Sequence, residues 1–128
     1  MIAGIGTDLV RIERIRHVLE RHGERFARRV LVETELARFR VHGSPHRFLA
    51  KRFAAKEALA KALGTGIGGE VSFQDLEIRN DAAGRPQVVP SKRLRDWMQS
   101  RGWRNLQLSL SDEDDLALAF AVVESAAL

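Results

Sequence analysis

The sequence contains no cysteine, no tyrosine and only three prolines, and it has no apolar run long enough to cross a membrane. The absence of cysteine excludes a disulfide framework and a cysteine-based zinc site, and it is compatible with a reducing cytosol. The first apolar stretch, residues 2–9, is shorter than a membrane span and lacks the basic region and cleavage site of a signal peptide. We therefore expect a cytoplasmic protein that is neither exported nor embedded in a membrane.

A chain of 128 residues has the length of one typical domain, and such a domain buries about two-thirds of the surface that its unfolded chain exposes. Its net charge of +4 and sequence pI of about 10.3 attract anionic partners. Nucleic acid, acidic proteins and phosphate-bearing small molecules all fit this charge. Charge alone does not choose among them.

The hydrophobic pattern predicts a single α+β domain over residues 1–128, with an antiparallel sheet packed against a long helix and shorter helices. Gly23 and Gly64 are expected to end helices. The expected elements, in order, are a strand over 2–9, a helix over 10–22, shorter helical pieces over 24–41, a long helix over 46–63, strands over 71–80 and 87–89, a helix over 91–101, and two adjacent antiparallel strands over 106–111 and 116–124.

The first expected strand has one nearly bare face, which carries Gly4, Gly6 and Asp8. Another element or a ligand could approach this face closely. If the long helix packs there, Asp8 and Glu57 could share a magnesium ion, which prefers oxygen ligands and usually takes one or two protein carboxylates. An alternative remains open, in which Asp8 caps the following helix while Glu57 and Lys61 form an exposed ion pair worth only about 0.3 to 0.5 kcal/mol.

The segment GTGIGG, residues 64–69, is rich enough in glycine to suggest a phosphate-binding loop. It lacks the Gly-Lys-Ser/Thr ending of a Walker loop, and it follows a helix instead of a strand, unlike a dinucleotide fingerprint. By itself it predicts a helix stop followed by a turn.

The first expected helix carries an arginine ridge, in which Arg14 and Arg21 fall within about 20° of one another and Arg11 lies about 60° to one side. Such a ridge could dock an acidic helix or a phosphate backbone, since arginine binds carboxylates and phosphates in a bidentate manner. A solvated helix face explains the same pattern. The four histidines show no spacing typical of a metal site.

Three segments of the chain closely resemble the holo-acyl-carrier-protein synthase family, the small phosphopantetheinyl transferases. They are GIGTDLVRIERI at 4–15, RFLAKRFAAKEALAKALGTGIG at 47–68 and SFQDLEIRNDAAGRP at 72–86. The resemblance implies the phosphopantetheinyl transferase fold and transfer of the 4′-phosphopantetheine arm of coenzyme A to a serine of acyl carrier protein, in support of fatty acid biosynthesis.

The same resemblance implies roles for individual residues. Asp8 and Glu57 would hold a magnesium ion that bridges the coenzyme A pyrophosphate, Glu57 would accept the serine proton, and Lys61 would offset charge on the phosphates. The coenzyme A contacts implied by the resemblance are Arg47, Arg52, Lys61, Gly64, Gly66 and Pro86. Arg14 matches the family's docking helix for the acidic carrier protein, whereas Arg21 is assigned to docking by geometry alone.

The resemblance also implies a homotrimer with active sites between subunits, in which Gln74 and Asp75 would serve the interface. One departure concerns the end of the strand over 106–111. Some family members carry a histidine there, where this chain has Ser111 and Asp112.

Two other readings compete with the transferase: a basic domain that binds nucleic acid, and a non-catalytic module that recognises an acidic helix through Arg14 and Arg21. The first is disfavoured because the aromatic residues follow apolar patterns instead of alternating with basic ones as a stacking platform would. We therefore expect neither nucleic acid nor a membrane among the partners.

Overall fold

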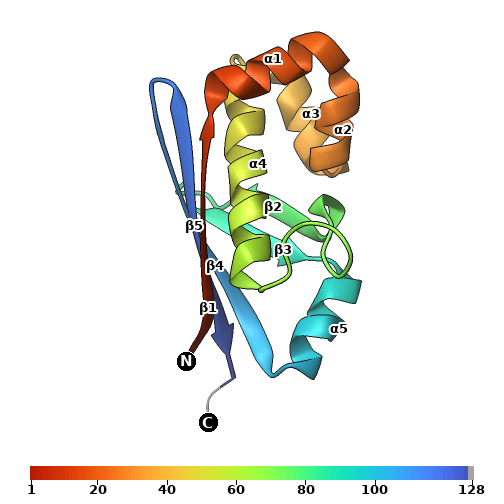
Figure 1. Ribbon diagram of the computed structural model, residues 1–128, viewed down its shortest axis with the longest axis vertical. Coiled ribbons are helices and arrows are strands. Elements are labelled where there is room, and N and C mark those ends of the chain that lie inside the picture. Colours follow the sequence, from red (N-terminus) through yellow and green to blue (C-terminus); the bar gives the residue numbers. More distant parts are fainter. Residues whose placement is uncertain (127–128) are drawn as a thin grey trace.

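A long helix, α4 (Pro45–Ala62), lies across one face of a three-stranded antiparallel sheet (Figure 1). The computed structural model describes residues 1–126. The strand order of this sheet is β1 (Ile2–Arg11), β5 (Leu116–Ser125) and β4 (Trp103–Glu113). The remaining elements are α1 (Ile12–His22), α2 (Glu24–Val30), α3 (Glu33–Val41), a 3-10 turn (Phe73–Asp75), a two-stranded antiparallel sheet of β2 (Leu76–Asn80) and β3 (Pro86–Pro90), and α5 (Lys92–Ser100).

Small residues bring α4 into close contact with β1, as the bare face of the first strand predicts. A Cβ atom added to Gly6 would lie 2.2 Å from the carbonyl oxygen of Ala58, and one added to Gly4 would lie 2.1 Å from that of Ala62. The central strand β5 also presents alanines to the helix, and these are fully or almost fully buried. The helix axis therefore lies nearer to the sheet than larger side chains would allow.

The pairing register decides which residues share the helix-covered face with Asp8. Asp8 lies opposite Ala119 of β5, which in turn lies opposite Leu110 of β4. On the opposite face Leu9 and Leu118 are paired, and both side chains are exposed. One face of the sheet thus holds α4, and the other presents apolar side chains to the outside of the single chain.

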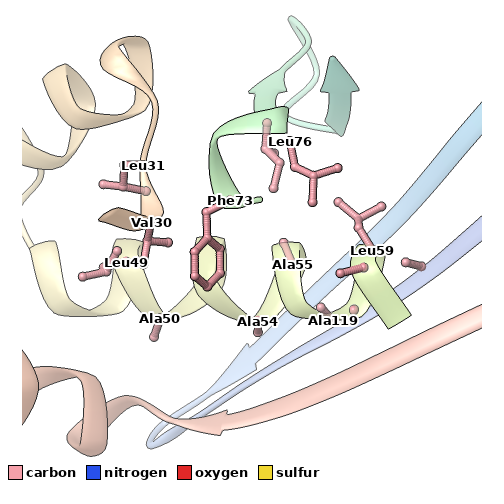
Figure 2. Close-up of a cluster of buried hydrophobic side chains, with 14 of the residues drawn as sticks. Val30, Leu31, Leu49, Ala50, Ala54, Ala55, Leu59, Phe73, Leu76 and Ala119 are labelled. Atoms are coloured by element: carbon pink, nitrogen blue, oxygen red, sulfur yellow. The ribbon is translucent and has the colours of Figure 1, made fainter. Parts of the chain in front are cut away.

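The side of α4 turned away from the sheet is covered by the end of α2 with its connection to α3, and by the 3-10 turn with the start of β2 (Figure 2). Val30 and Leu31 come from the first of these, and Phe73 and Leu76 come from the second; all four are buried. Burial of such side chains is the main favourable term in folding. No helix within residues 1–126 is long and apolar enough to span a membrane.

Several boundaries differ from the prediction for physical reasons. β4 spans Trp103–Glu113 where a strand over 106–111 was expected, because residues on both sides of that range also pair with β5. The first strand continues to Arg11 because Val10 and Arg11 still pair with β5, so α1 starts at Ile12 and Asp8 lies inside the strand. The expected strand over 71–80 is replaced at its start by the 3-10 turn. β2 and β3 form a sheet of their own, so the chain has two antiparallel sheets where one was expected.

Gln74 and Asp75 make internal contacts. The Gln74 side-chain amide donates hydrogen bonds to the carbonyl oxygens of Arg28, Arg29 and Leu31 at the end of α2. The Asp75 carboxylate accepts hydrogen bonds from the side chains of Ser72, Ser91 and Arg93. Within the single chain these residues tie three segments together, and their role at a subunit interface stays a prediction.

Candidate functional site

Residues from two distant segments meet where β1 passes under the C-terminal half of α4. Lys61 Nζ donates to Asp8 Oδ1 at 3.1 Å and to the carbonyl oxygen of Thr7 at 3.0 Å. Asp8 is only 18% exposed as a side chain, whereas Lys61 is 51% exposed. This pair depends on the glycine face of β1, because larger side chains there would move α4 away from Asp8.

The structure contradicts the alternative drawn from sequence spacing. Within residues 1–126, Lys61 forms its ion pair with Asp8 and none with Glu57. Asp8 does not cap the following helix either, since α1 begins after Arg11 and has no side-chain cap.

Glu57 lies in the electrostatic field of the same cluster. Burial raises the pKa of the Glu57 carboxyl above its ordinary value of 4.5, and repulsion from Asp8 adds to the rise, while Lys61 and Arg14 oppose it. Two carboxylates that disfavour each other's charge are a suitable pair for a divalent cation, which would relieve the repulsion.

The donor set fits magnesium better than zinc. Within residues 1–126 no group of three histidine, aspartate or glutamate side chains gathers in a way that could hold a metal ion. A site with two carboxylates leaves other coordination positions to water and to substrate phosphates, which is the usual arrangement for magnesium. Asp8 and Glu57 are the residues that could hold it.

The raised pKa of Glu57 has a consequence for stability that can be measured without any ligand. Folding makes this acid harder to ionise, so its ionised form costs stability once the pH has risen past the unfolded pKa. We expect Glu57→Gln to raise the free energy of unfolding near neutral pH in metal-free buffer. The gain should be below about 1 kcal/mol because the group is partly solvated.

Urea denaturation at neutral pH and near pH 4 tests this expectation. At about pH 4 and below, the carboxyl is protonated in both states, so the difference between Glu57→Gln and the parent should shrink. A variant that is less stable than the parent at neutral pH would show that the Glu57 carboxylate is not strained by its surroundings.

The glycine-rich segment folds back onto the end of α4, close to Lys61. The Ala60 carbonyl oxygen accepts hydrogen bonds from the backbone N–H groups of Thr65 and Gly66, each at 3.1 Å. Gly64 and Gly66 have φ angles of +82° and +66°, a region that favours glycine. The segment is a helix stop and turn, as predicted, and it brings Gly64 and Gly66 to the same end of α4 as Lys61.

A second candidate region is a cavity of about 470 Å³ beside the N-terminal half of α4. Four cationic side chains line it, together with an aromatic ring, an asparagine amide and a proline. The lining includes Arg38, Arg47, Lys51, Arg52, Phe48, Asn80, Gly84 and Pro86. Of the coenzyme A contacts expected from the sequence, Arg47, Arg52 and Pro86 meet here, whereas Lys61, Gly64 and Gly66 do not line this cavity.

The two regions lie on opposite flanks of α4. Asp8 is on β1, at one edge of the sheet, whereas Leu110 of the cavity wall is on β4, at the other edge. The central strand β5 separates them. One chain therefore does not bring the two sets of residues to the same side of the helix.

Asp112, at the position of the departure noted above, is bound to the cations of this cavity. Its carboxylate accepts a hydrogen bond from Arg47 at 2.9 Å and forms an ion pair with Lys51 at 3.3 Å. Burial acts to raise the pKa of Asp112, but the contacts with Arg47 and Lys51 outweigh it and hold the pKa below its ordinary value. Where some family members carry a histidine, this chain has a carboxylate that holds two cavity residues in place.

The arginine ridge lies on the outer side of α1. Arg14 and Arg21 line the same surface depression of about 430 Å³, together with Arg11, His17 and Val18. Within residues 1–126 no carboxylate pairs with Arg14 or Arg21, although Arg16 of the same helix binds both Glu13 and Glu20. Arg14 also lies close enough to Glu57 to influence its pKa. The ridge therefore borders the carboxylate cluster.

Several cavity residues were missed by the sequence analysis. Lys51 had a signal, since it follows Arg47 by one helical turn and so lies on the same side of α4. Arg38 and Asn80 come from other elements, and no spacing relates them to α4. Glu35 and Lys56, which are buried beneath the cavity, had no signal because a charged residue on a helix is ordinarily read as exposed.

Comparisons with known proteins agree on one family. Residues 4–121 match the family model described as the 4′-phosphopantetheinyl transferase superfamily. The chain is 49% identical over 124 residues to a holo-[acyl-carrier-protein] synthase of Neisseria meningitidis, covering 97% of this chain and 99% of that protein. A synthase of Azoarcus sp. is 50% identical over 125 residues, covering 98% of this chain and 99% of its own.

Solved structures give the same result for the fold. The crystal structure of a holo-[acyl-carrier-protein] synthase from Neisseria meningitidis superposes with a TM-score of 0.94 at 48% identity, covering 98% of this chain and 100% of the other. A synthase from Bacillus anthracis in complex with CoA (3′,5′-ADP) gives a TM-score of 0.83 at 41% identity, covering 98% and 99%. The α+β fold expected from the sequence is confirmed.

Proposed function

The chain belongs to the 4′-phosphopantetheinyl transferase superfamily, and we infer that it is an enzyme that transfers the 4′-phosphopantetheine group of coenzyme A to a serine of an apo acyl carrier protein. The products are the holo carrier protein, which serves fatty acid biosynthesis, and adenosine 3′,5′-bisphosphate. The observation that carries the inference is the meeting of Asp8, Glu57 and Lys61, since these residues come from two of the three segments that resemble the family.

We propose that Asp8 and Glu57 hold a magnesium ion. When bound, the ion supplies charge neutralisation for the pyrophosphate of coenzyme A. The residues themselves position the reactants: the transfer forms a bond from the serine oxygen to the phosphorus that carries the pantetheine arm, and breaks the bond from that phosphorus to the leaving phosphate. Such reactions need alignment and charge stabilisation more than covalent help from the protein.

Glu57 and Lys61 have separate roles in this proposal. Glu57 accepts the proton of the attacking serine as a general base, directly or through a water molecule. Lys61 offsets the charge that develops on the phosphates, and its half-exposed ammonium is available to them. The turn at Gly64 and Gly66 would line the same end of the site, and its N–H groups are already used in hydrogen bonds to the carbonyl oxygens of Lys61 and Ala60.

The cationic cavity takes the other phosphate of coenzyme A. If the pyrophosphate lies at Asp8 and Glu57, the 3′-phosphate is the remaining strong anion, and Arg47, Lys51 and Arg52 provide an unusual density of positive charge for it. Pro86 would lie against the adenine. Because the two regions flank α4 on opposite sides, we propose that the cavity of one subunit faces the carboxylates of the next.

A homotrimer would also cover the open face of the three-stranded sheet. Ile5, Leu9, Leu118 and Phe120 are 61%, 59%, 43% and 42% exposed, and register places them on the face that α4 leaves open. A contiguous apolar face on a chain of this size is typical of a subunit interface.

We expect Phe120→Glu to convert the trimer to a monomer and to abolish transfer, because the charge would be buried in the interface and the divided site would be lost. Sedimentation equilibrium should give three copies of the 14.4 kDa chain for the parent and one for the variant. Val41→Glu is the matched control, since Val41 is 84% exposed but lies on α3, away from the sheet. A monomeric parent with full activity would contradict the proposed assembly.

Carrier docking is proposed for the arginine ridge. The double reversal Arg14→Glu/Arg21→Glu should raise KM for the carrier protein at least about tenfold, because two attractive contacts with an acidic partner become repulsive. KM for coenzyme A should change little. Lys92→Glu/Arg104→Glu makes the same change in net charge on other exposed positions and serves as the control. An equal loss in both double variants would mean that total charge, and not this surface, attracts the carrier.

Intact mass spectrometry tests the proposed function. An apo acyl carrier protein incubated with the chain, coenzyme A and magnesium should gain the mass of one phosphopantetheine group, and chelation should prevent the gain. If several folded carrier proteins remain unmodified, the transferase proposal fails. The comparisons do not favour a non-catalytic module that binds nucleic acid or an acidic helix. Cytoplasmic location and a single functional domain over residues 1–128 stay predictions.

A further inference from the structure

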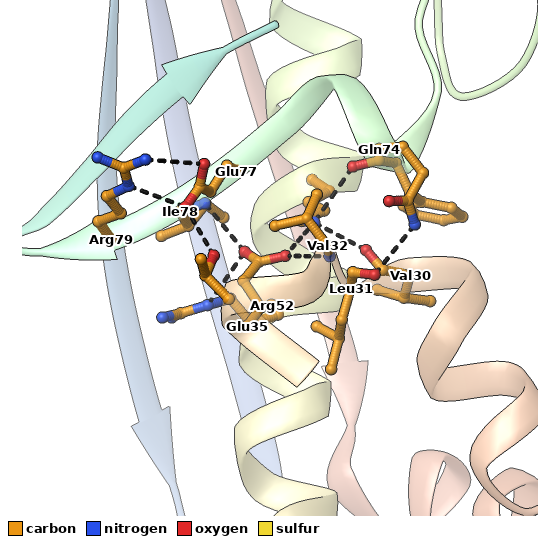
Figure 3. Close-up of polar contacts among 12 residues, drawn as sticks. Val30, Leu31, Val32, Glu35, Arg52, Gln74, Glu77, Ile78 and Arg79 are labelled. Carbon is orange, nitrogen blue, oxygen red and sulfur yellow. Dashed lines mark hydrogen bonds and ion pairs between the residues drawn. The ribbon is translucent and has the colours of Figure 1, made fainter. Parts of the chain in front are cut away.

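A cluster of three charged side chains is buried between α3, α4 and β2 (Figure 3). Lys56 and Glu35 are 0% and 1% exposed, and Arg52 is 4% exposed. Lys56 Nζ contacts Glu35 Oε1 at 2.6 Å, and Arg52 Nε lies 3.4 Å from Glu35 Oε2. The cluster contains two cations and one anion, so one positive charge is left without a buried counter-charge.

The Glu35 carboxylate is shared between Arg52 and three other donors. Its Oε1 accepts from the Val32 N–H at 2.9 Å as well as from Lys56, and its Oε2 accepts from the Ile78 N–H at 2.9 Å. Lys56 in turn uses its other hydrogens on the carbonyl oxygens of Val30 and Phe73. Glu35 and Lys56 therefore satisfy each other and the backbone around them.

Arg52 is the member of the cluster that remains unsatisfied. Its Nε is buried and has no hydrogen-bond partner among residues 1–126. One terminal nitrogen donates to Asn80 Oδ1 at 3.2 Å, and the guanidinium lies 4.7 Å from the centre of the Phe48 ring. Burial lowers the pKa of Arg52, and Glu35 only partly opposes this. A buried cation in this state is costly unless an anion meets it.

The position of Arg52 shows where such an anion would enter. Arg52 lines the cavity of about 470 Å³ at the N-terminal half of α4, whereas Glu35 and Lys56 do not. Arg47 and Lys51 of the same wall are held by Asp112, whereas Arg52 has Glu35 Oε2 at 3.4 Å from its Nε and shares that carboxylate with Lys56. Arg52 is thus the buried cation of the cavity wall, and it shares its counter-charge with a second cation.

We propose that Lys56 is a positioning residue for nucleotide binding: by sharing the buried Glu35 carboxylate with Arg52, it keeps a net positive charge at the Arg52 guanidinium in the cavity wall, where Arg52 binds the 3′-phosphate of coenzyme A. The proposal rests on the proposed function for the identity of the nucleotide. Lys56 touches neither the phosphate nor the reacting atoms. It acts through Glu35, whose negative charge would otherwise neutralise Arg52 alone.

A purely structural role for the cluster makes a different prediction. If Lys56 only supported the fold, its loss would weaken every substrate alike. In the proposed role its loss selectively weakens a ligand that carries the 3′-phosphate. The useful quantity is the ratio of kcat/KM for coenzyme A to kcat/KM for dephospho-coenzyme A, which lacks that phosphate, because a general defect cancels in the ratio.

The experiment compares four proteins: the parent, Arg52→Met, Lys56→Met and Glu35→Gln/Lys56→Met. The parent should prefer coenzyme A, and Arg52→Met should lose at least about tenfold of that preference, as expected for a lost charge-assisted contact. Lys56→Met should lose a similar factor, since Glu35 then neutralises Arg52. The double variant removes the carboxylate as well, so its ratio should return to within about threefold of the parent ratio, which is a small free-energy difference.

The double variant also keeps the test decisive if Lys56→Met alone does not fold. Removing one member of a buried ion pair is strongly destabilising, whereas replacing both members is often neutral. If Lys56→Met does not fold, the comparison of the double variant with Arg52→Met decides alone. The proposal is overturned if the double variant and Arg52→Met show equally low ratios of kcat/KM for coenzyme A to kcat/KM for dephospho-coenzyme A. It is also overturned if Lys56→Met folds and keeps the ratio of the parent.

Direct binding separates this proposal from the proposed function. Calorimetry with adenosine 3′,5′-bisphosphate and adenosine 5′-monophosphate measures the same preference without transfer. The parent could modify no carrier protein and still prefer the bisphosphate to the monophosphate, with this preference reduced in Arg52→Met and Lys56→Met and restored in the double variant. In that case the proposed function fails and the role of Lys56 holds. If the parent transfers normally but shows no preference for the 3′-phosphate, the role of Lys56 fails alone.

Discussion

Replacement of both Asp8 and Glu57 by alanine is expected to lower turnover at least about a thousandfold, because removal of a single preorganised charge stabiliser already costs about a hundred- to a thousandfold. Two terms are lost together: the carboxylates that would hold the magnesium ion, and the proposed acceptor of the serine proton. Transfer should be measured by intact mass spectrometry over long incubations, with coenzyme A and magnesium in excess.

The controls for this double variant separate catalysis from binding and folding. Carrier docking should be retained within about threefold, since it is proposed for the arginine ridge and not for the carboxylates. Metal-free stability should change by less than about 1 kcal/mol, because the loss of the partly exposed Asp8–Lys61 pair is offset by removal of the Glu57 carboxyl, whose charge is disfavoured by burial. Glu13→Ala/Glu20→Ala removes two exposed carboxylates of α1 and should keep most activity. Turnover within tenfold of the parent would refute the assignment of the metal pair.

The sequence predicted the part of the site that depends on local pattern. The alternation over residues 2–9 placed Gly4, Gly6 and Asp8 on one face, and the absence of side chains on the first two left room for a helix. The structure has α4 there, and the contact brings Lys61 to Asp8. Binary alternation is a strong signal because a strand offers only two faces.

The rest of the site could not be predicted, because it depends on contacts between segments whose relative positions the sequence does not encode locally. The cavity combines Arg38 of α3 and Asn80 of β2 with residues of α4, and it lies on the flank opposite Asp8. Lys56 lies one residue before Glu57, yet it is fully buried. Its burial depends on Glu35, which arrives from another helix.

Gly6→Ala is expected to be among the most damaging single substitutions in this chain. The added Cβ atom would meet the Ala58 carbonyl oxygen at 2.2 Å, the Ala62 nitrogen at 2.6 Å and the Lys61 Cβ atom at 2.9 Å. The first two are backbone atoms of α4 and cannot rotate away, so the helix must move from the sheet. Overpacking a core typically costs about 1–3 kcal/mol, and we expect a loss of about 3 kcal/mol or more in the free energy of unfolding.

The same displacement should reduce activity in the fraction of Gly6→Ala that remains folded. Lys61 and Glu57 are on α4 and Asp8 is on β1, so a shift between the two elements separates the proposed catalytic groups, and a misplacement of about 1 Å can cost about a hundredfold in rate. Urea denaturation and single-turnover transfer measure the two effects. Gly43→Ala is the matched control for stability, because nothing lies within 4 Å of its added Cβ atom and its φ angle does not require glycine. If Gly6→Ala unfolded at the same urea concentration as Gly43→Ala and kept its activity, then the close approach of α4 to β1 would not be what assembles Asp8, Glu57 and Lys61.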